Sequence, residues 1–105
     1  MEKPNNTYLD ELCGDNEKFR QKVVKILKKE LPLEIDVYKK EMSKNDYCSA
    51  AQAVHKLKHK ISILGLEKSY YIASNYEDNL NNNSIALQND FENILKAMQE
   101  FVIEL

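Results

Sequence analysis

The 105-residue sequence is poor in glycine, proline and cysteine, with two of each, and it has no tryptophan. Glycine and proline interrupt regular structure most strongly, so their scarcity favours an all-α chain. Strand-type alternation of apolar and polar residues is also hard to find. Cys13 and Cys48 are too few and too far apart for the disulfide framework of a small secreted protein. We therefore expect two reduced and mostly buried thiols.

Long apolar runs and an excess of one charge are also lacking. No apolar run approaches the roughly 18 residues of a membrane span, and the N-terminal MEKPNNTYLD lacks the apolar region of a signal peptide. Fifteen basic residues are interspersed with 17 acidic ones, which gives a net charge of −2 and no large basic field for nucleic acid. We expect a cytoplasmic protein without a membrane or nucleic acid as partner. The length suits one domain over residues 1–105, and nothing demands more than a monomer.

Four long segments carry apolar residues at spacings of three and four, which is typical of helices with one buried face. The first stripe comprises Phe19, Val23, Ile26 and Leu27, and it continues with Leu31, Ile35, Tyr38 and Met42. The second comprises Ala50, Val54, Leu57, Ile61 and Leu64, and the third Leu66, Ala73, Tyr76 and Leu80. The last comprises Leu87, Phe91, Ile94, Leu95, Met98, Phe101 and Leu105.

Polar residues, glycines and one proline predict where these helices begin and end. The expected N-terminal caps are Thr7 (in a capping box with Asp10), Asp15 and Ser84. Gly14 and Gly65 are expected at helix C-termini, and Pro32 predicts a kink or break near Leu31. The loops are short, so sequential helices should be antiparallel. The sequence thus predicts an all-α antiparallel up-down four-helix bundle with a short extra N-terminal helix.

The stretch HKLKHKISILG, residues 55–65, contains both histidines of the chain. At about 100° per residue, the apolar side chains of this helix fall on one arc that defines the core face. His55 lies about 140° from the centre of that arc, and His59 points almost directly away from it. We therefore expect both imidazoles to project into solvent from a packed helix.

Three interpretations of the outward histidines remain open from the residues alone. The first is an ordinary solvated face. The second is a metal pair, because histidines at i and i+4 can share an ion, although a structural zinc site takes four ligands and no Cys-x-x-Cys or acidic residue joins this stripe. The third is covalent chemistry, because a neutral imidazole is a nucleophile near neutral pH. Lys58 could neutralise an anion formed on His55, and no acid is positioned as a general base for hydrolysis.

The same stretch resembles the histidine phosphotransfer (HPt) domain of multistep phosphorelays. The residues His55-Lys56-Leu57-Lys58, with Gly65 ten positions after His55, are similar to that family's H-x-L-K-G-S-x-x-x-x-G. The family continues as G-A-x-x-L-x-x-x-C-x-x-L-E, and the corresponding positions here are Gly65-Leu66, Ala73, Tyr76 and Glu77. The resemblance covers about residues 15–105.

This resemblance implies that His55 accepts a phosphoryl group on Nε2 and that Lys58 stabilises it. The donor and the acceptor would be response-regulator receiver domains, including those of a hybrid sensor histidine kinase. Magnesium would belong to the receiver, so the chain would need no cofactor or metal of its own. The protein would be a phosphocarrier rather than an enzyme, since no nucleotide motif is present. The alternative is a helical interaction module that binds a receiver or kinase without accepting phosphate.

Two positions depart from the family pattern. His59 replaces the usual glycine, where its side chain could narrow partner choice, add a donor to the phosphoryl oxygens or form a rival acceptor. Ser69 replaces a usual leucine, with Tyr70 next to it to fill the space. Glu77 is expected to have a structural role as a solvated or helix-linking charge. The expected partner contacts lie along the outer face: Gln52, Lys56, His59, Ser62 and Ile63.

Overall fold

The computed structural model describes residues 2–105, and within this range the chain forms five α-helices and no strand. The helices are α1 (Thr7–Cys13), α2 (Glu17–Ser43), α3 (Tyr47–Ile63), α4 (Glu67–Asn81) and α5 (Gln88–Ile103). The all-α prediction is therefore confirmed, and so is the short N-terminal helix that precedes four longer ones.

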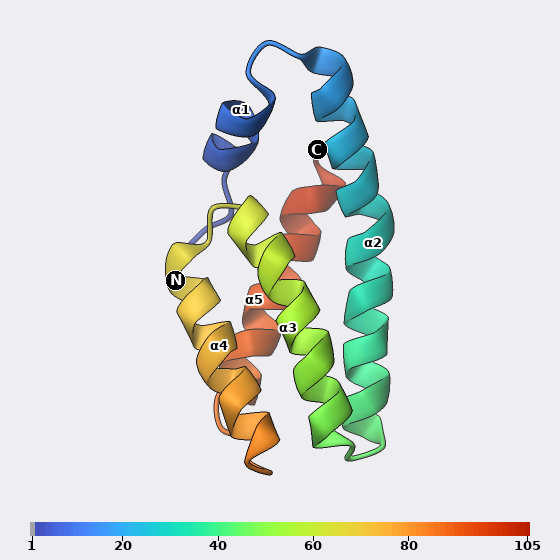
Figure 1. Cartoon of the computed structure of the whole chain (residues 1–105), viewed down its shortest axis with the longest axis vertical. Coiled ribbons are helices and arrows are strands. Elements are labelled where there is room, and N and C mark those ends of the chain that lie inside the picture. Colours follow the sequence, from blue (N-terminus) through green and yellow to red (C-terminus); the bar gives the residue numbers. More distant parts are fainter. Residues whose placement is uncertain (1) are drawn as a thin grey trace.

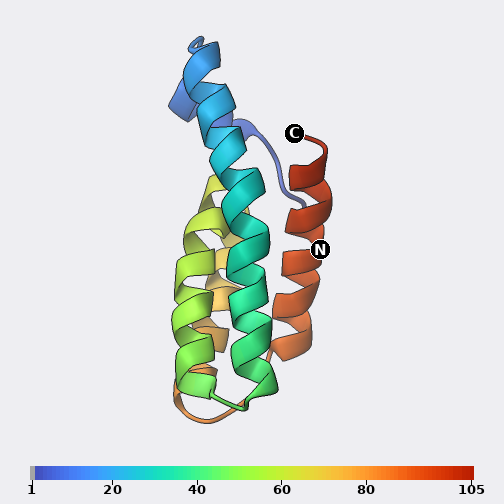
Figure 2. The ribbon, with the colours of Figure 1, turned by 90° about the vertical axis from the view of Figure 1, so that its right-hand side faces the viewer.

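The four longer helices lie alongside one another, and α1 sits at one end of them (Figures 1 and 2). Helix α3 packs mainly against α2 and α4, and α5 also packs against both, so α3 and α5 lie on opposite corners. The molecule measures 45 × 23 × 18 Å. Helix α2 has 27 residues, whereas α3 has 17, so the N-terminal end of α2 extends beyond α3 and contacts α1 (Figure 1).

The predicted core is correct for α3, which carries both histidines, and for its neighbour α4. Every predicted core residue of α3 and α4, and of the turn between them, is buried. In α5 the middle of the stripe is buried, its ends are half-buried, and Val102 joins the core unpredicted. The prediction is wrong for the start of α2, where Phe19 and Ile26 are 40% and 45% exposed. Both residues lie in the N-terminal half of α2, whose end extends beyond α3 (Figure 1).

Pro32 does not interrupt α2, so the predicted break is wrong. A proline in a helix leaves the carbonyl four residues earlier without its amide partner. That carbonyl belongs to Lys28, and both Lys28 and Pro32 are exposed, so water can satisfy the free group. The adjacent Leu31 and Ile35 are both buried, and their packing holds α2 together on either side of the proline.

The predicted N-terminal caps were close in sequence but not the residues used. Asn16, not Asp15, caps α2 by accepting the amide of Phe19 at 3.0 Å. Thr7 lies inside α1, and its amide donates to the side chain of Asn5, so the capping box is wrong. Ser84 accepts the amide of Ala86 in a loop, and α5 begins only after Leu87, which has a left-handed backbone. Asparagine and aspartate compete closely for such positions, so spacing alone does not choose between them.

Gly65 ends α3 as predicted, and it also holds the N-terminal segment in place. The amide of Leu66 donates to the carbonyl of Ile61 and that of Gly65 to Ser62, a pattern that requires the positive φ of 74° at Gly65. The Asn5 side chain lies so close to Gly65 that a Cβ there would overlap it. The amide of Asn5 also donates to the carbonyl of Leu64 at 2.9 Å.

Glu2 extends this N-terminal contact to α4. Its carboxylate accepts the amides of Lys68 and Ser69 at 3.1 and 2.9 Å, and so supplies the cap that Leu66 cannot. Partial burial raises the pKa of Glu2, but the bonds from Ser69 and Lys68 outweigh it and leave the pKa below its usual value. The N-terminal segment therefore fastens the start of α4.

The rotation of α4 is fixed by a buried hydrogen-bond network around Tyr76. The hydroxyl of Tyr76 lies 2.7 Å from that of Tyr38 on α2, and Tyr38 donates to Glu92 on α5 at 2.9 Å. Burial and these bonds raise the pKa of Tyr38, so it stays a neutral donor. Because Tyr76 points into the core, the next residue, Glu77, is turned toward α3.

The two cysteines differ in environment. Cys13 is buried at the end of α1, as predicted, but Cys48 is exposed in the first turn of α3, which contradicts the expectation for that thiol. Both are free. Across residues 2–105, the helices are all too short or too polar to cross a membrane.

Candidate functional site

The outward direction of the histidines is confirmed. His55 and His59 are both exposed on α3, and the side chain of His55 is 59% accessible. Their ring centroids lie 5.9 Å apart, and the ring planes are nearly perpendicular, at 87°. The side chain of Asp46 caps the start of this helix by accepting the amide of Ser49, and the opposite face is buried. The rings therefore project from a firmly held helix.

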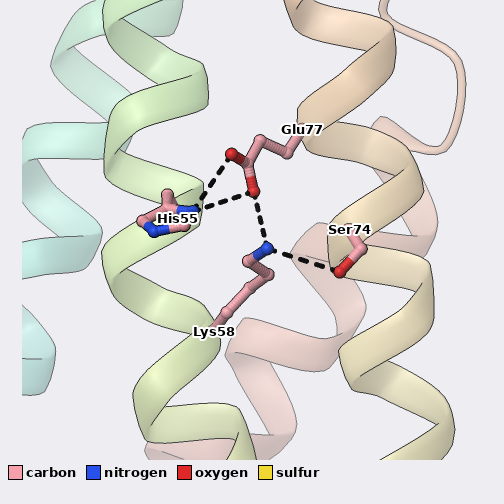
Figure 3. Close-up of polar contacts among 4 residues, drawn as sticks. All are labelled: His55, Lys58, Ser74 and Glu77. Atoms are coloured by element: carbon pink, nitrogen blue, oxygen red, sulfur yellow. Dashed lines mark hydrogen bonds and ion pairs between the residues drawn. The ribbon is translucent and has the colours of Figure 1, made fainter.

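Glu77 of α4 reaches across to this face of α3. One carboxylate oxygen lies 3.1 Å from Nδ1 of His55, and the other lies 2.9 Å from Nζ of Lys58 (Figure 3). We call these three residues the Glu77 cluster. No acidic residue of α3 itself joins the stripe of the histidines, as expected, but Glu77 reaches His55 from the neighbouring helix. The only sequence signal for this contact was the match of Glu77 to the last residue of the family pattern.

The contact with Glu77 selects one form of the His55 ring. An ionised carboxylate can only accept a hydrogen bond, so Nδ1 must carry the proton. Nε2 of a neutral ring then has a free lone pair. Figure 3 shows the two ring nitrogens on opposite sides, with one directed at Glu77 and the other away from the groove between α3 and α4. The result is a nucleophilic nitrogen that faces solvent, with a carboxylate behind it.

Lys58 lies on the flank of α3 that faces α4. Its side chain is only 13% exposed, and Nζ lies between the Glu77 carboxylate and the hydroxyl of Ser74, which is 3.4 Å away. The ammonium also lies 5.4 Å from the centre of the Tyr70 ring. Lys58 is thus on the Nδ1 side of His55, in the groove between α3 and α4, and its charge is paired with Glu77.

The other predicted contact residues divide into two groups. Gln52, Lys56 and Ser62 are exposed on α3, as expected. Ile63 is half-buried against the core, so its assignment to the exposed face is wrong. It lies three residues after Lys60 and therefore on the flank of α3 that faces α2.

Lys60 forms a second charge cluster on that flank, which the sequence analysis did not identify. Its Nζ lies 2.9 Å from Glu30 and 3.0 Å from Glu34, two carboxylates one turn apart on α2. We call these three residues the Lys60 cluster. Burial lowers the pKa of Lys60, but the two hydrogen-bonded carboxylates outweigh it and raise the pKa above its usual value. The ammonium is therefore firmly charged and tied to α2.

A groove between α2 and α3 runs beside the exposed histidine face. It has a volume of about 340 Å³, and its lining includes Leu33, Val37, Gln52 and Lys56. Leu33 and Val37 are more than half exposed, although both are apolar. They were missed because they lie on a different helix and outside the predicted core stripe. Any protein that approaches His55 from this side would cover them.

The site combines an exposed histidine, a carboxylate against one of its ring nitrogens and a neighbouring groove with exposed apolar side chains. Among residues 2–105, no three histidine, cysteine, aspartate or glutamate side chains gather so that they could hold a metal ion. The arrangement suits nucleophilic chemistry on His55 with a large partner at hand. No protein-family model, curated protein or solved structure matches the chain.

Proposed function

We propose that the protein is a histidine phosphocarrier that passes a phosphoryl group between aspartate side chains of receiver domains in a two-component phosphorelay. The observation that carries the proposal is the state of His55. Its Nδ1 is held by Glu77 at 3.1 Å, while the ring stands 59% exposed on a rigid helix. The resemblance of residues 55–65 and Glu77 to histidine phosphotransfer domains supports the same conclusion.

The proposed reaction needs only the groups present in the Glu77 cluster and the partner. The lone pair of Nε2 attacks the phosphorus of an aspartyl phosphate, the bond from phosphorus to the carboxylate oxygen breaks, and the aspartate leaves as a carboxylate. The His55 ring keeps its Nδ1 proton and becomes positively charged. Glu77 stabilises this charge through the hydrogen bond that it already makes. The reverse steps deliver the phosphoryl group to the next receiver.

Lys58 serves this reaction by positioning Glu77. Its ammonium balances the carboxylate at 2.9 Å and keeps one oxygen directed at His55. Without Lys58, Glu77 would lose its cationic partner in a groove where its side chain is only 19% exposed. The phosphoryl stabilisation that the family resemblance implies would require Nζ to leave this ion pair. We therefore assign Lys58 to the orientation of the site.

The partner surface extends from α3 to α2. A receiver that reaches Nε2 of His55 would cover Gln52 and Lys56, together with the exposed Leu33 and Val37 in the neighbouring groove. We interpret α2 to α5 as the antiparallel up-down four-helix bundle of such a carrier. Magnesium belongs to the acidic pocket of the receiver, and the carrier itself acts without a cofactor.

The proposal is tested by phosphotransfer from a panel of phosphorylated receiver domains to the full chain. We expect acid-labile, alkali-stable label on the wild-type protein and none on the His55→Gln variant. Circular dichroism should be the same for both, because His55 lies outside the core. Binding of a receiver without any label would instead support the interaction module, and full labelling of His55→Gln would exclude His55 as the acceptor.

A further inference from the structure

The cationic side chains near His55 do not all lie on the side of the ring where a phosphoryl group would be attached. A phosphoryl group on Nε2 would stand on the solvent side of the ring, away from the groove that holds Glu77 and Lys58 (Figure 3). Lys58 is committed to Glu77 at 2.9 Å. The cation that the sequence motif provides is therefore on the wrong side of the ring to meet the anion.

The other basic side chains of α3 are not equivalent. Lys60 is bonded to both Glu30 and Glu34 and faces α2. Lys56 follows His55 directly, so it leaves the helix about 100° away and lines the groove between α2 and α3. His59 leaves the helix only about 40° from His55, one turn along, on the same solvent-exposed side.

We propose that His59 binds the phosphoryl group carried by His55, by donating an N–H hydrogen bond from its imidazole to a phosphoryl oxygen. The two rings already lie 5.9 Å apart and nearly perpendicular, so neither stacks flat on the other. The inference rests on the proposed phosphocarrier function and adds a phosphoryl-binding residue to it. It also gives a role to the histidine that replaces the glycine of the family pattern.

The chemical reason is the charge that accumulates during transfer. A phosphoryl group has negative charge spread over its oxygens, and the ring of His59 lies 5.9 Å from that of His55 on the exposed face of α3. Hydrogen bonds to charged groups are stronger than those between neutral ones. His59 thus donates to the phosphoryl group on the exposed side of the ring, while Glu77 accepts from Nδ1 on the side of the groove.

The role of His59 is tested by the rate at which phosphoramidate phosphorylates His55, which needs no protein partner. Nε2 of His55 attacks the phosphorus, the bond from phosphorus to nitrogen in the reagent breaks, and ammonia leaves. We expect His59→Ala to load about tenfold more slowly than the wild type, the size of one charge-assisted hydrogen bond. His59→Lys should recover most of the rate, and His59→Gln, which keeps a neutral donor, should lie between. Lys39→Ala, an exposed lysine on α2, is the matched control and should load normally.

A fourth variant separates phosphoryl binding from ring packing. His59→Phe keeps an aromatic ring beside His55 but has no donor, so it should load as slowly as His59→Ala. Recovery of the rate by His59→Phe and not by His59→Lys would overturn the proposal, as would equal rates for the wild type and His59→Ala. Label that remains on His59 in a His55→Gln background would also overturn it, because His59 would then be an acceptor.

Failure of the proposed function gives a different result. A wild-type chain that is folded but takes no label from phosphoramidate or from any receiver would exclude the phosphocarrier, and His59 would lose its role with it. A wild-type chain that loads normally while all His59 variants load equally would exclude only the role of His59.

Discussion

Helix α3 is tied to its two neighbours by two charge clusters with opposite compositions. On one flank the Lys60 cluster places one lysine between two carboxylates of α2. On the other flank the Glu77 cluster places one carboxylate of α4 between a lysine and a histidine of α3. In the first cluster the Lys60 ammonium is charged and paired with both carboxylates, so the cluster offers no free nucleophile. In the second, one nitrogen of the histidine remains free and exposed.

The comparison teaches that an ion pair can become a reactive site when one of its side chains has a second polar atom outside the pair. Lysine and glutamate each present one charged group, so a cluster made only of these residues links helices and does no more. Imidazole has two nitrogens on opposite sides of a ring, and a bond to one controls the state of the other. Three variants, one of them followed over pH, can break or sharpen this contrast.

Glu77→Gln should have the largest effect on transfer. The amide can donate as well as accept, so Nδ1 of His55 is no longer forced to carry the proton, and the charge that stabilises the phosphorylated ring is lost. Loss of such a supporting contact costs about 10- to 100-fold, and we expect that reduction in the rate of phosphotransfer from a receiver. A rate within twofold of the wild type would show that Glu77 does not control the state of His55.

Lys58→Met should have a smaller effect in the same direction. Methionine keeps the length and the apolar stem of the side chain but removes the charge that holds Glu77. We expect the transfer rate to fall about fivefold, which corresponds to about 1 kcal/mol. Stopped-flow or rapid-quench transfer measures the change. A loss as complete as that of His55→Gln would assign Lys58 a direct contact with the phosphoryl group.

Lys60→Met should separate stability from transfer. It leaves Glu30 and Glu34 one turn apart without their cation, at a position where the Lys60 side chain is only 12% exposed. We expect the free energy of unfolding to fall by about 1 kcal/mol in urea titrations, while the transfer rate stays unchanged. Slower phosphotransfer by Lys60→Met with an unchanged free energy of unfolding would contradict the assignment of the Lys60 cluster to stability alone.

The pH dependence of that stability difference should be the smallest effect. The pKa of Lys60 is raised in the folded state by Glu30 and Glu34. Its contribution is therefore complete below the unfolded-state pKa of about 10.4 and is lost as the pH rises through the higher folded-state value. The difference in unfolding free energy between the wild type and Lys60→Met should stay constant from neutral pH to about pH 9 and shrink above about pH 10. Titration of Tyr38 occurs in both proteins and cancels from the difference.

The sequence predicted those features that depend on one helix at a time. Periodicity alone placed His55 and His59 outside and Leu57 and Ile61 inside, because burial on a helix follows its own 3.6-residue repeat. It could not find the contact between His55 and Glu77, since that depends on how α4 is rotated by Tyr76. It also could not foresee that Phe19 would be exposed, because exposure there depends on where α3 and α4 end.

The N-terminal segment has a consequence for how readily the start of α4 opens. Glu2 caps α4 from 66 positions away in the chain, and Asn5 is fastened beside Gly65. Terminal segments that are held by a few exposed hydrogen bonds open more readily than the core of a protein. Hydrogen exchange at the amides of Lys68 and Ser69 therefore reports docking of the first residues of the chain. Helix α4, which presents Glu77, therefore begins at a cap that Glu2 supplies from a distant part of the sequence.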